Sequence, residues 1–218
     1  MKNHLALKLL LPLLLFLIIA PFTPEIDLFL SKQFFSENQF SFNPLWDLFY
    51  HYGIYPAWFG ALICLILLVK KKQAALIYLL TFAIGAGTIT QGIFKTFWQR
   101  PRPLQTDLFG GSYAYHPFWK YAIHANDQLK SLPCGHCTMG FQFFSLILMG
   151  IFLKNKYLTF LGLFLTFFFG FGLSVARLAK GGHYFSDILI GMLIMWFSAV
   201  ISEEIIKLSI RKNALDKV

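Results

Sequence analysis

Two residues near the end of the chain, His183 and Asp187, have the types and the spacing of a nucleophilic histidine and the carboxylate that supports it. They are four residues apart, so on a helix their side chains would share one face. A carboxylate held against one imidazole nitrogen fixes the tautomer and leaves the other nitrogen free to attack. Asp187 stands at the edge of an apolar run, where a carboxylate needs a partner. The pair therefore predicts nucleophilic catalysis by a histidine.

A second cluster contains three cations, Lys95, Arg100 and Arg102, interleaved with Pro101 and Pro103. Anchoring of a helix end at the membrane surface would explain Lys95 alone. It explains three cations and two prolines less well. Fixed cations stabilise the charge on the equatorial oxygens of a phosphoryl group during its transfer. The cluster therefore indicates an anion-binding function.

A third cluster, Pro133-Cys134-Gly135-His136-Cys137, stands just before an apolar run. Glycine lets backbone amides approach a ligand, and the first N–H groups of a helix attract an anion. A histidine placed there can donate a proton to a departing oxygen. The alternative is a helix cap with an incidental histidine. Taken together, the three clusters supply cations, two histidines, a carboxylate and free amides, which is a set that suits phosphate.

Membrane helices must position these clusters, because a soluble protein of this size could not bury so much apolar surface. Of the 218 residues, 57% are hydrophobic and 13% are charged, whereas soluble domains have roughly 25% charged residues. Six segments have the length and the apolar character of a spanning helix. They lie at about 5–22, 53–69, 74–94, 138–153, 157–176 and 186–206. We therefore expect an all-α polytopic membrane protein with six transmembrane helices.

The connections between these helices complete the expected architecture, a single membrane-embedded domain over residues 1–218. Residues 23–52 have the character of an amphipathic segment at the membrane surface. We expect this segment on the periplasmic side. The first helix is expected to be retained rather than cleaved as a signal peptide, because no small-x-small cleavage site follows it.

The positive charges between the segments predict the orientation of the helices. The side that holds both termini would carry 11 of the 19 Lys and Arg residues. Those 11 are Lys2, Lys8, Lys70, Lys71, Lys72, Lys154, Lys156, Lys207, Arg211, Lys212 and Lys217. The other eight fall mainly in the motif-bearing stretches, so we expect the termini in the cytoplasm and the site on the periplasmic face of an inner membrane. The net charge of +9 comes without a basic stripe on a soluble face, which argues against nucleic-acid binding.

In its three clusters the chain resembles the superfamily of type 2 phosphatidic acid phosphatases and vanadium haloperoxidases. That superfamily has the motifs Lys-x6-Arg-Pro, Pro-Ser-Gly-His and Ser-Arg-x5-His-x3-Asp, in this order. The corresponding stretches here are Lys95-x6-Arg102-Pro103, Pro133-Cys134-Gly135-His136 and Ala176-Arg177-x5-His183-x3-Asp187. Order and internal spacing agree in all three, and the resemblance covers about residues 80–200.

The resemblance implies which residues bind the substrate. Lys95, Arg102 and Arg177 would bind the phosphate, and the backbone around Gly135 would donate hydrogen bonds to it. Cys134 would occupy the position of the motif serine, where its thiol replaces a hydroxyl donor.

The resemblance also implies the catalytic residues. His183 would be the nucleophile, Asp187 would orient it, and His136 would be the general acid. Ala176 replaces a second motif serine, but it is not one of the chemical actors. No metal and no cofactor are required.

The reaction implied is phosphoric monoester hydrolysis on a membrane lipid. Residues 102–111 and 181–187 look like the subgroup that removes phosphate from lipid A at position 1 or 4′. Undecaprenyl diphosphate, phosphatidylglycerophosphate and phosphatidic acid remain open as substrates. So does a phosphotransferase, since any hydroxyl can open a phosphohistidine. A transporter or flippase would explain the helices but not the spacing of His183 and Asp187. The sequence does not predict an oligomeric state.

Cys134 and Cys137 form a C-x-x-C pair that we expect to be two free thiols. The tetrapeptide matches the active site of disulfide isomerases, but the βαβ pattern those enzymes need is absent. A disulfide is the alternative, because Cα atoms three residues apart at a helix start can lie about 5–6 Å apart. The periplasm would also favour oxidation.

Overall fold

The computed structural model describes residues 2–41, 43–120 and 129–216, and it confirms the all-α membrane architecture. Within these ranges six helical stretches are long and apolar enough to cross a membrane. They are His4–Gln33, Pro44–Val69, Ala75–Phe97, Gly135–Phe152, Lys156–Ala179 and Phe185–Asn213. Each overlaps one of the six predicted segments, and several extend beyond it. Lys217, which the charge argument included, lies outside the described residues.

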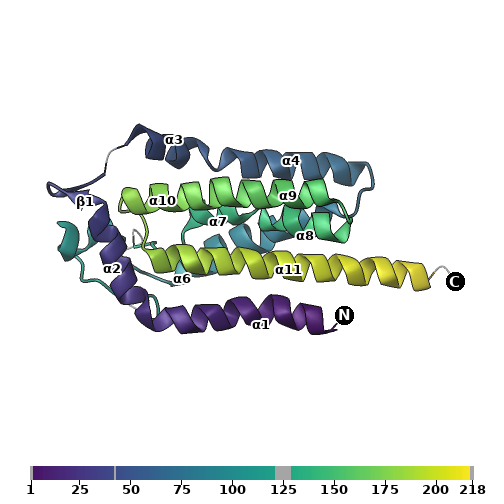
Figure 1. Ribbon diagram of the computed structural model, residues 1–218, viewed down its shortest axis with the longest axis horizontal. Coiled ribbons are helices and arrows are strands. Elements are labelled where there is room, and N and C mark those ends of the chain that lie inside the picture. Colours follow the sequence, from purple (N-terminus) through teal and green to yellow (C-terminus); the bar gives the residue numbers. More distant parts are fainter. Residues whose placement is uncertain (1, 42, 121–128, 217–218) are drawn as a thin grey trace.

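The first span bends where two prolines interrupt it. It consists of α1 (Lys2–Ile19), the 3₁₀ turn η1 (Ala20–Phe22) and α2 (Thr23–Gln33). Pro21 and Pro24 stand in the first turns of η1 and α2, where a missing N–H costs little. α2 turns away from α1 and lies at one end of the helix bundle (Figure 1). The sequence predicted that α2 lies only at the membrane surface. Asp27 of α2 is fully buried, so this helix is also part of the core at that end.

A short hairpin and a helix complete the predicted surface segment. The elements are β1 (Phe35–Ser36), β2 (Gln39–Phe40) and α3 (Pro44–Tyr52). The hairpin was not predicted; it pairs Phe35 with Phe40, and both rings pack on Phe109. Asn43 caps α3 by accepting a hydrogen bond from Leu45 N at 2.9 Å.

The spans that follow along the chain include those that carry the motifs. Their elements are α4 (Tyr55–Val69), α5 (Ala75–Thr81), the π-helix η2 (Phe82–Phe94), α6 (Lys95–Phe97), α7 (Gly135–Phe141), α8 (Phe144–Phe152), α9 (Lys156–Leu165), the π-helix η5 (Thr166–Phe171), α10 (Gly172–Ala179) and α11 (Phe185–Leu215). Two 3₁₀ turns, η3 (Pro103–Gln105) and η4 (Asp107–Phe109), lie in the connection after α6. Because the spans alternate in direction, α6, the start of α7, the end of α10 and the start of α11 meet at one end, which we call the motif end.

α11 is the central helix of the bundle. It contacts α1, α2, α5, α7, α8 and η2. Its inward residues Met195, Ala199 and Val200 are fully buried. Tyr78 shows how a polar group in the core is paired, since its OH donates a hydrogen bond to Ala57 O at 2.8 Å. The helix whose first turn carries Asp187 is therefore held on several sides.

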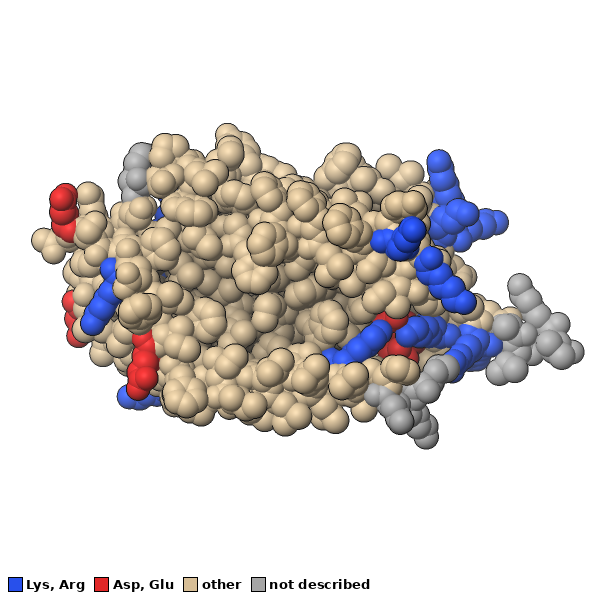
Figure 2. Space-filling view, viewed as in Figure 1, with Lys and Arg blue, Asp and Glu red and all other residues tan. Residues whose placement is uncertain are grey.

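The outer surface has the form expected of a membrane protein. Figure 2 shows a broad band without charged residues across the middle of the face that it draws. Large apolar side chains of the membrane spans, such as Leu14, Phe59, Phe160 and Phe167, are exposed. Lys and Arg gather at the end opposite the motif end, where both termini lie (Figures 1 and 2). Such a band can be solvated by lipid chains but not by water.

Candidate active site

The three sequence clusters meet in one cavity of about 550 Å³ at the motif end. Six of the eight predicted site residues line it: Lys95, Arg102, Gly135, His136, Arg177 and His183. Asp187 and Cys134 do not line it. The remaining lining includes two apolar side chains, those of Ile54, directly before α4, and Trp58, on α4. The cavity thus joins a cationic, histidine-bearing wall to an apolar wall that belongs to a membrane span.

His183 and Asp187 are close together, but not for the reason the spacing suggested. The prediction that they share a helix face is wrong, because α11 begins at Phe185 and Tyr184 is its extended N-cap. His183 therefore precedes the helix, and Asp187 reaches back from its first turn. His183 Nδ1 lies 3.5 Å from Asp187 Oδ2, which is longer than a full hydrogen bond. Catalytic contacts of this kind often tighten only when substrate is bound.

The electrostatic surroundings keep His183 neutral. Complete burial is the main cause of a pKa well below the usual 6.5, and Lys95 and Arg177 lower it further. Asp187 acts in the opposite direction but does not outweigh them. With Asp187 at Nδ1, the other nitrogen, Nε2, is free on a side chain that lines the cavity. A neutral imidazole with a free nitrogen can attack an electrophile.

Asp187 is held from three sides besides His183. Its Oδ1 accepts a hydrogen bond from Arg100 at 2.5 Å. Its Oδ2 accepts from Ser131 Oγ at 2.5 Å and from the Tyr184 amide at 2.9 Å. The carboxylate is fully buried, so these contacts fix its position beside the imidazole.

The three predicted cations of the cavity wall come from different parts of the chain, and Lys130 also lines the cavity. Lys95 is on α6, Arg102 follows it in the chain, and Arg177 is in the last turn of α10. Lys95 Nζ donates hydrogen bonds to the carbonyl oxygens of Lys130 and Ser131. Gly182 makes room for Arg177, because a Cβ at this glycine would come within 2.8 Å of the guanidinium. Within the described residues, none of the three cations forms an ion pair with a carboxylate.

The turn that carries His136 contains a disulfide. The expectation of two free thiols is wrong, because Cys134 and Cys137 are bonded, with Cα atoms 5.2 Å apart. Cys134 is also the N-cap of α7, and its sulfur accepts a hydrogen bond from the Cys137 amide at 3.2 Å. It is fully buried and does not reach the cavity, so the structure does not place it against a substrate. Gly135 and His136, the next two residues, do line the cavity.

Tyr50, on α3, is a cavity residue that the sequence did not single out. Its ring stacks on His136, with centroids 5.4 Å apart and an angle of 19° between the planes. The Arg177 guanidinium lies 4.7 Å from the same ring centroid, and Lys180 Nζ lies 5.0 Å from it. Tyr50 thereby links His136, the predicted general acid, to Arg177, a cation that the sequence predicted to bind phosphate. Nothing in its sequence context distinguished it from the other aromatic residues of residues 23–52.

Arg100 belongs to the second sequence cluster but has a different location from Lys95 and Arg102. It is buried beside Asp187 and Asp27 and does not line the cavity. Burial opposes its charge, but the two carboxylates outweigh that effect and raise its pKa. Asp27 was a detectable candidate, because it is an ionisable residue within a membrane-associated segment.

Metal binding at the site would require several ligand side chains close together. Among the described residues, no group of three or more His, Cys, Asp and Glu side chains is arranged so that it could hold a metal ion.

A six-span membrane protein with two histidines and four cations (Lys95, Arg102, Lys130 and Arg177) around one cavity has the features of a membrane-embedded enzyme of phosphoryl chemistry. Residues 74–210 match the PAP2 superfamily, and the chain belongs to that family. It is 26% identical over 180 residues to the lipid A 4′-phosphatase of Francisella tularensis subsp. novicida (strain U112), covering 76% of this chain and 79% of that protein. No solved structure matches the chain. Family and relative identify the chain as a phosphoric monoester hydrolase.

Proposed function

We propose that the protein is a lipid phosphatase that works through a phosphohistidine on His183. The observation that carries this proposal is the position of His183 between Asp187 at Nδ1 and the cations of the cavity. Asp187 favours a proton on Nδ1 and stabilises the imidazolium that forms during attack. The cations are placed to hold the phosphoryl group at the other nitrogen.

The reaction would proceed in two steps. In the first, Nε2 of His183 forms a bond to phosphorus while the bond from phosphorus to the lipid oxygen breaks. His136 donates a proton to that oxygen, and the dephosphorylated lipid leaves. In the second step a water attacks phosphorus, His136 takes its proton, and the bond from nitrogen to phosphorus breaks. Phosphate is released, and both histidines return to their starting states.

Lys95, Arg102 and Arg177 have the role of binding the phosphoryl oxygens. Their charge supports the equatorial oxygens as the bond to the leaving group lengthens. The backbone at Gly135, the first residue of α7, adds N–H donors on the same side. These assignments use six residues of the cavity wall together with Asp187, and they leave Cys134 without a substrate contact.

The apolar wall of the cavity supports a lipid substrate. Ile54 and Trp58 lie on the second span, and Met139 lies on the fourth. A phosphate headgroup in the cationic part would therefore leave an attached hydrocarbon group beside membrane-facing helices. A lipid A-type phosphomonoester is the substrate we propose, on the basis of the similarity to lipid A 4′-phosphatase. Undecaprenyl diphosphate, phosphatidylglycerophosphate and phosphatidic acid are the alternatives, as is transfer to a second lipid.

The membrane orientation is also a proposal. Exposed lysines lie in the loops around Lys71 and Lys154, at the same end as both termini. The positive-inside rule assigns that end to the cytoplasm. The active site would then open to the periplasm from an inner membrane, and the whole chain would form one phosphatase domain. A tag at Asn213 should report the cytoplasm, whereas a tag at Ser112 should report the periplasm; reversed labelling would contradict this orientation.

A panel of purified lipids tests the function. Phosphate release in detergent should be fastest with a lipid A-type phosphomonoester, and vanadate should inhibit it because it mimics five-coordinate phosphorus. His183→Ala, purified in parallel, controls for contaminating phosphatases. Release from none of the lipids, or release that His183→Ala retains, would contradict the proposed function.

A further inference from the structure

We propose that Asp27, on α2, is a positioning residue of the phosphatase: through Arg100 it fixes Asp187 and supplies the excess negative charge that supports His183 during attack. The inference rests on the proposed function, since it assumes that His183 becomes cationic in the first step. It concerns a residue that precedes the part of the chain matched by the family, residues 74–210.

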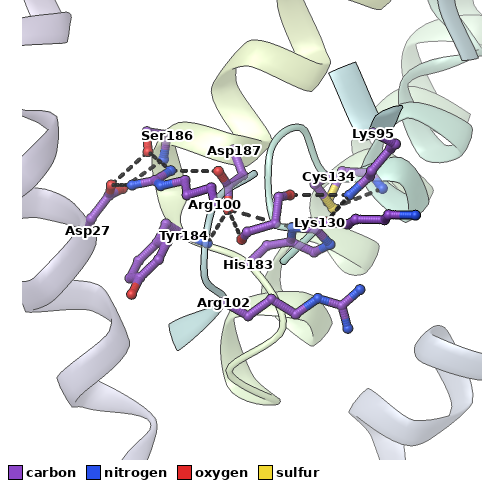
Figure 3. A network of polar contacts seen from close by, with 12 residues as sticks. Asp27, Lys95, Arg100, Arg102, Lys130, Cys134, His183, Tyr184, Ser186 and Asp187 are labelled. Carbon is purple, nitrogen blue, oxygen red and sulfur yellow. Dashed lines mark hydrogen bonds and ion pairs between the residues drawn. A yellow bond between two sulfur atoms is a disulfide. The ribbon is translucent and has the colours of Figure 1, made fainter. Parts of the chain in front are cut away.

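Arg100 joins two carboxylates on two helices. Its Nη1 donates to Asp187 Oδ1 at 2.5 Å, and its Nη2 donates to Asp27 Oδ2 at 2.9 Å. The guanidinium also donates to Ser186 Oγ at 2.8 Å and lies 4.5 Å from the centroid of the Tyr184 ring. Figure 3 shows Asp27, Arg100, Asp187 and His183 in sequence, leading from α2 toward the cavity. An arginine that bridges two carboxylates in such a row, with one nitrogen on each, couples the position of one carboxylate to that of the other.

Asp27 itself is held firmly. Its Oδ1 accepts from the Ser186 amide at 2.8 Å, and its Oδ2 accepts from Ser186 Oγ at 2.6 Å and from Tyr115 OH at 3.0 Å. The Ser186 amide belongs to the first turn of α11, immediately before Asp187. Asp27 therefore fixes both Arg100 and the backbone that carries Asp187. The carboxylate is completely buried, so solvent does not screen its charge.

The charges explain why a second carboxylate is useful. Arg100 alone would neutralise Asp187, and a neutral pair would give little support to an imidazolium. With Asp27 the three groups carry one net negative charge. Among the described residues, Lys95 and Arg177 oppose an imidazolium on His183, and Arg102, Lys130 and His136 line the same cavity. The negative charge of the Asp27–Arg100–Asp187 row offsets this opposition at the moment when His183 bonds to phosphorus.

Asp27→Asn tests the inference, because it removes the charge and keeps the shape. We expect kcat to fall about 10–100-fold, the size of loss common for an outer-shell partner, with KM and inhibition by inorganic phosphate little changed. The acid limb of kcat should also move to lower pH, because the loss of a negative charge disfavours the imidazolium form of His183. Glu25→Gln removes a carboxylate from the same helix at an exposed position and should behave as wild type. Tyr115→Phe removes one hydrogen bond to Asp27 without changing charge, so it should leave the acid limb in place.

Two results would overturn the inference: a kcat for Asp27→Asn within twofold of wild type, or a fall in kcat with an unmoved acid limb. Asp27→Glu gives a second test if the asparagine variant does not fold. The extra methylene displaces the carboxylate but keeps its charge, so the acid limb should stay in place while kcat falls; an undiminished kcat would contradict a positioning role. Wild type and His183→Ala are assayed first. If wild type lacks phosphatase activity, or if His183→Ala retains it, the proposed function fails, and that result is distinct from any result with Asp27.

Discussion

The two sides of His183 are built on opposite principles. On the buried side, Arg100 forms ion pairs with two carboxylates, and every one of the three groups is almost completely inaccessible. On the cavity side, Lys95, Arg102 and Arg177 have no carboxylate partner within the described residues. A cation that lacks a protein counterion near a cavity retains its attraction for an anion. The comparison indicates that the charges behind the nucleophile hold the structure and support His183, whereas the charges in front of it are available to an anionic group.

Replacing one arginine on each side with methionine should separate these roles. Of the substitutions considered, these should change stability and activity most. Arg100→Met leaves two buried carboxylates without a counterion, so the free energy of unfolding should fall by about 3–5 kcal/mol. Arg102→Met should change that free energy by less than about 0.5 kcal/mol. It should instead lower kcat/KM by about 10²–10³-fold, because a transition-state contact is lost. Thermal unfolding in detergent and steady-state kinetics check the pair. Equal stability of the two variants would contradict the division.

Tyr50 tests whether the cavity side also depends on ring packing. Tyr50→Leu removes the stack on His136 and the contact with Arg177, and such contacts are worth about 0.5–1.5 kcal/mol. We therefore expect kcat/KM to fall up to about tenfold. Tyr50→Phe is the matched control, since it keeps the ring and should retain most of the activity. If phenylalanine reduces activity as much as leucine does, the hydroxyl is the active part of Tyr50 and the stacking interpretation fails.

The pH dependence reports the balance of charge around His183. Activity requires a neutral His183, and burial together with Lys95 and Arg177 lowers its pKa below 6.5. Activity is therefore kept above the lowered pKa and lost as the pH falls through it. The acid limb of kcat/KM, which reports the free enzyme, should lie below pH 6.5. An acid limb above that value would mean that Asp187 dominates the electrostatics of the imidazole.

The disulfide should have the smallest effect. It closes a loop of only a few residues, so its contribution to stability through chain entropy is small. We expect Cys134→Ser to keep activity within about threefold of wild type, since Cys134 does not reach the cavity. Reductant should alter the activity of wild type slightly and that of Cys137→Ser not at all. A large loss in Cys134→Ser would mean that the bridge is needed to place His136.

The sequence predicted the cavity side of the site better than the buried side. Local spacing identified Lys95, His136 and His183, because each lies in a motif at the end of an apolar segment. Tyr50 and the β1–β2 hairpin come from residues 23–52, whose contacts with the motif end are long-range and have no local signature. Asp27 stood out only as an ionisable residue of that segment, and its partner Arg100 is 73 residues away in the sequence. The disulfide could not be predicted from the spacing of Cys134 and Cys137 alone, because it depends on the backbone conformation at the start of α7. The helix-face argument for Asp187 failed because the helix begins after His183 and not before it.

Rapid quench with lipid substrate labelled in its phosphate tests the central claim most directly. Wild type should accumulate a phosphoenzyme that is stable in base and labile in acid, and peptide mapping should locate the label on His183. His136→Ala should form the same adduct but slow the turnover of a poor leaving group more than that of an activated aryl phosphate. A labelled adduct in His183→Ala, or turnover by wild type with no acid-labile adduct at any quench time, would contradict the account.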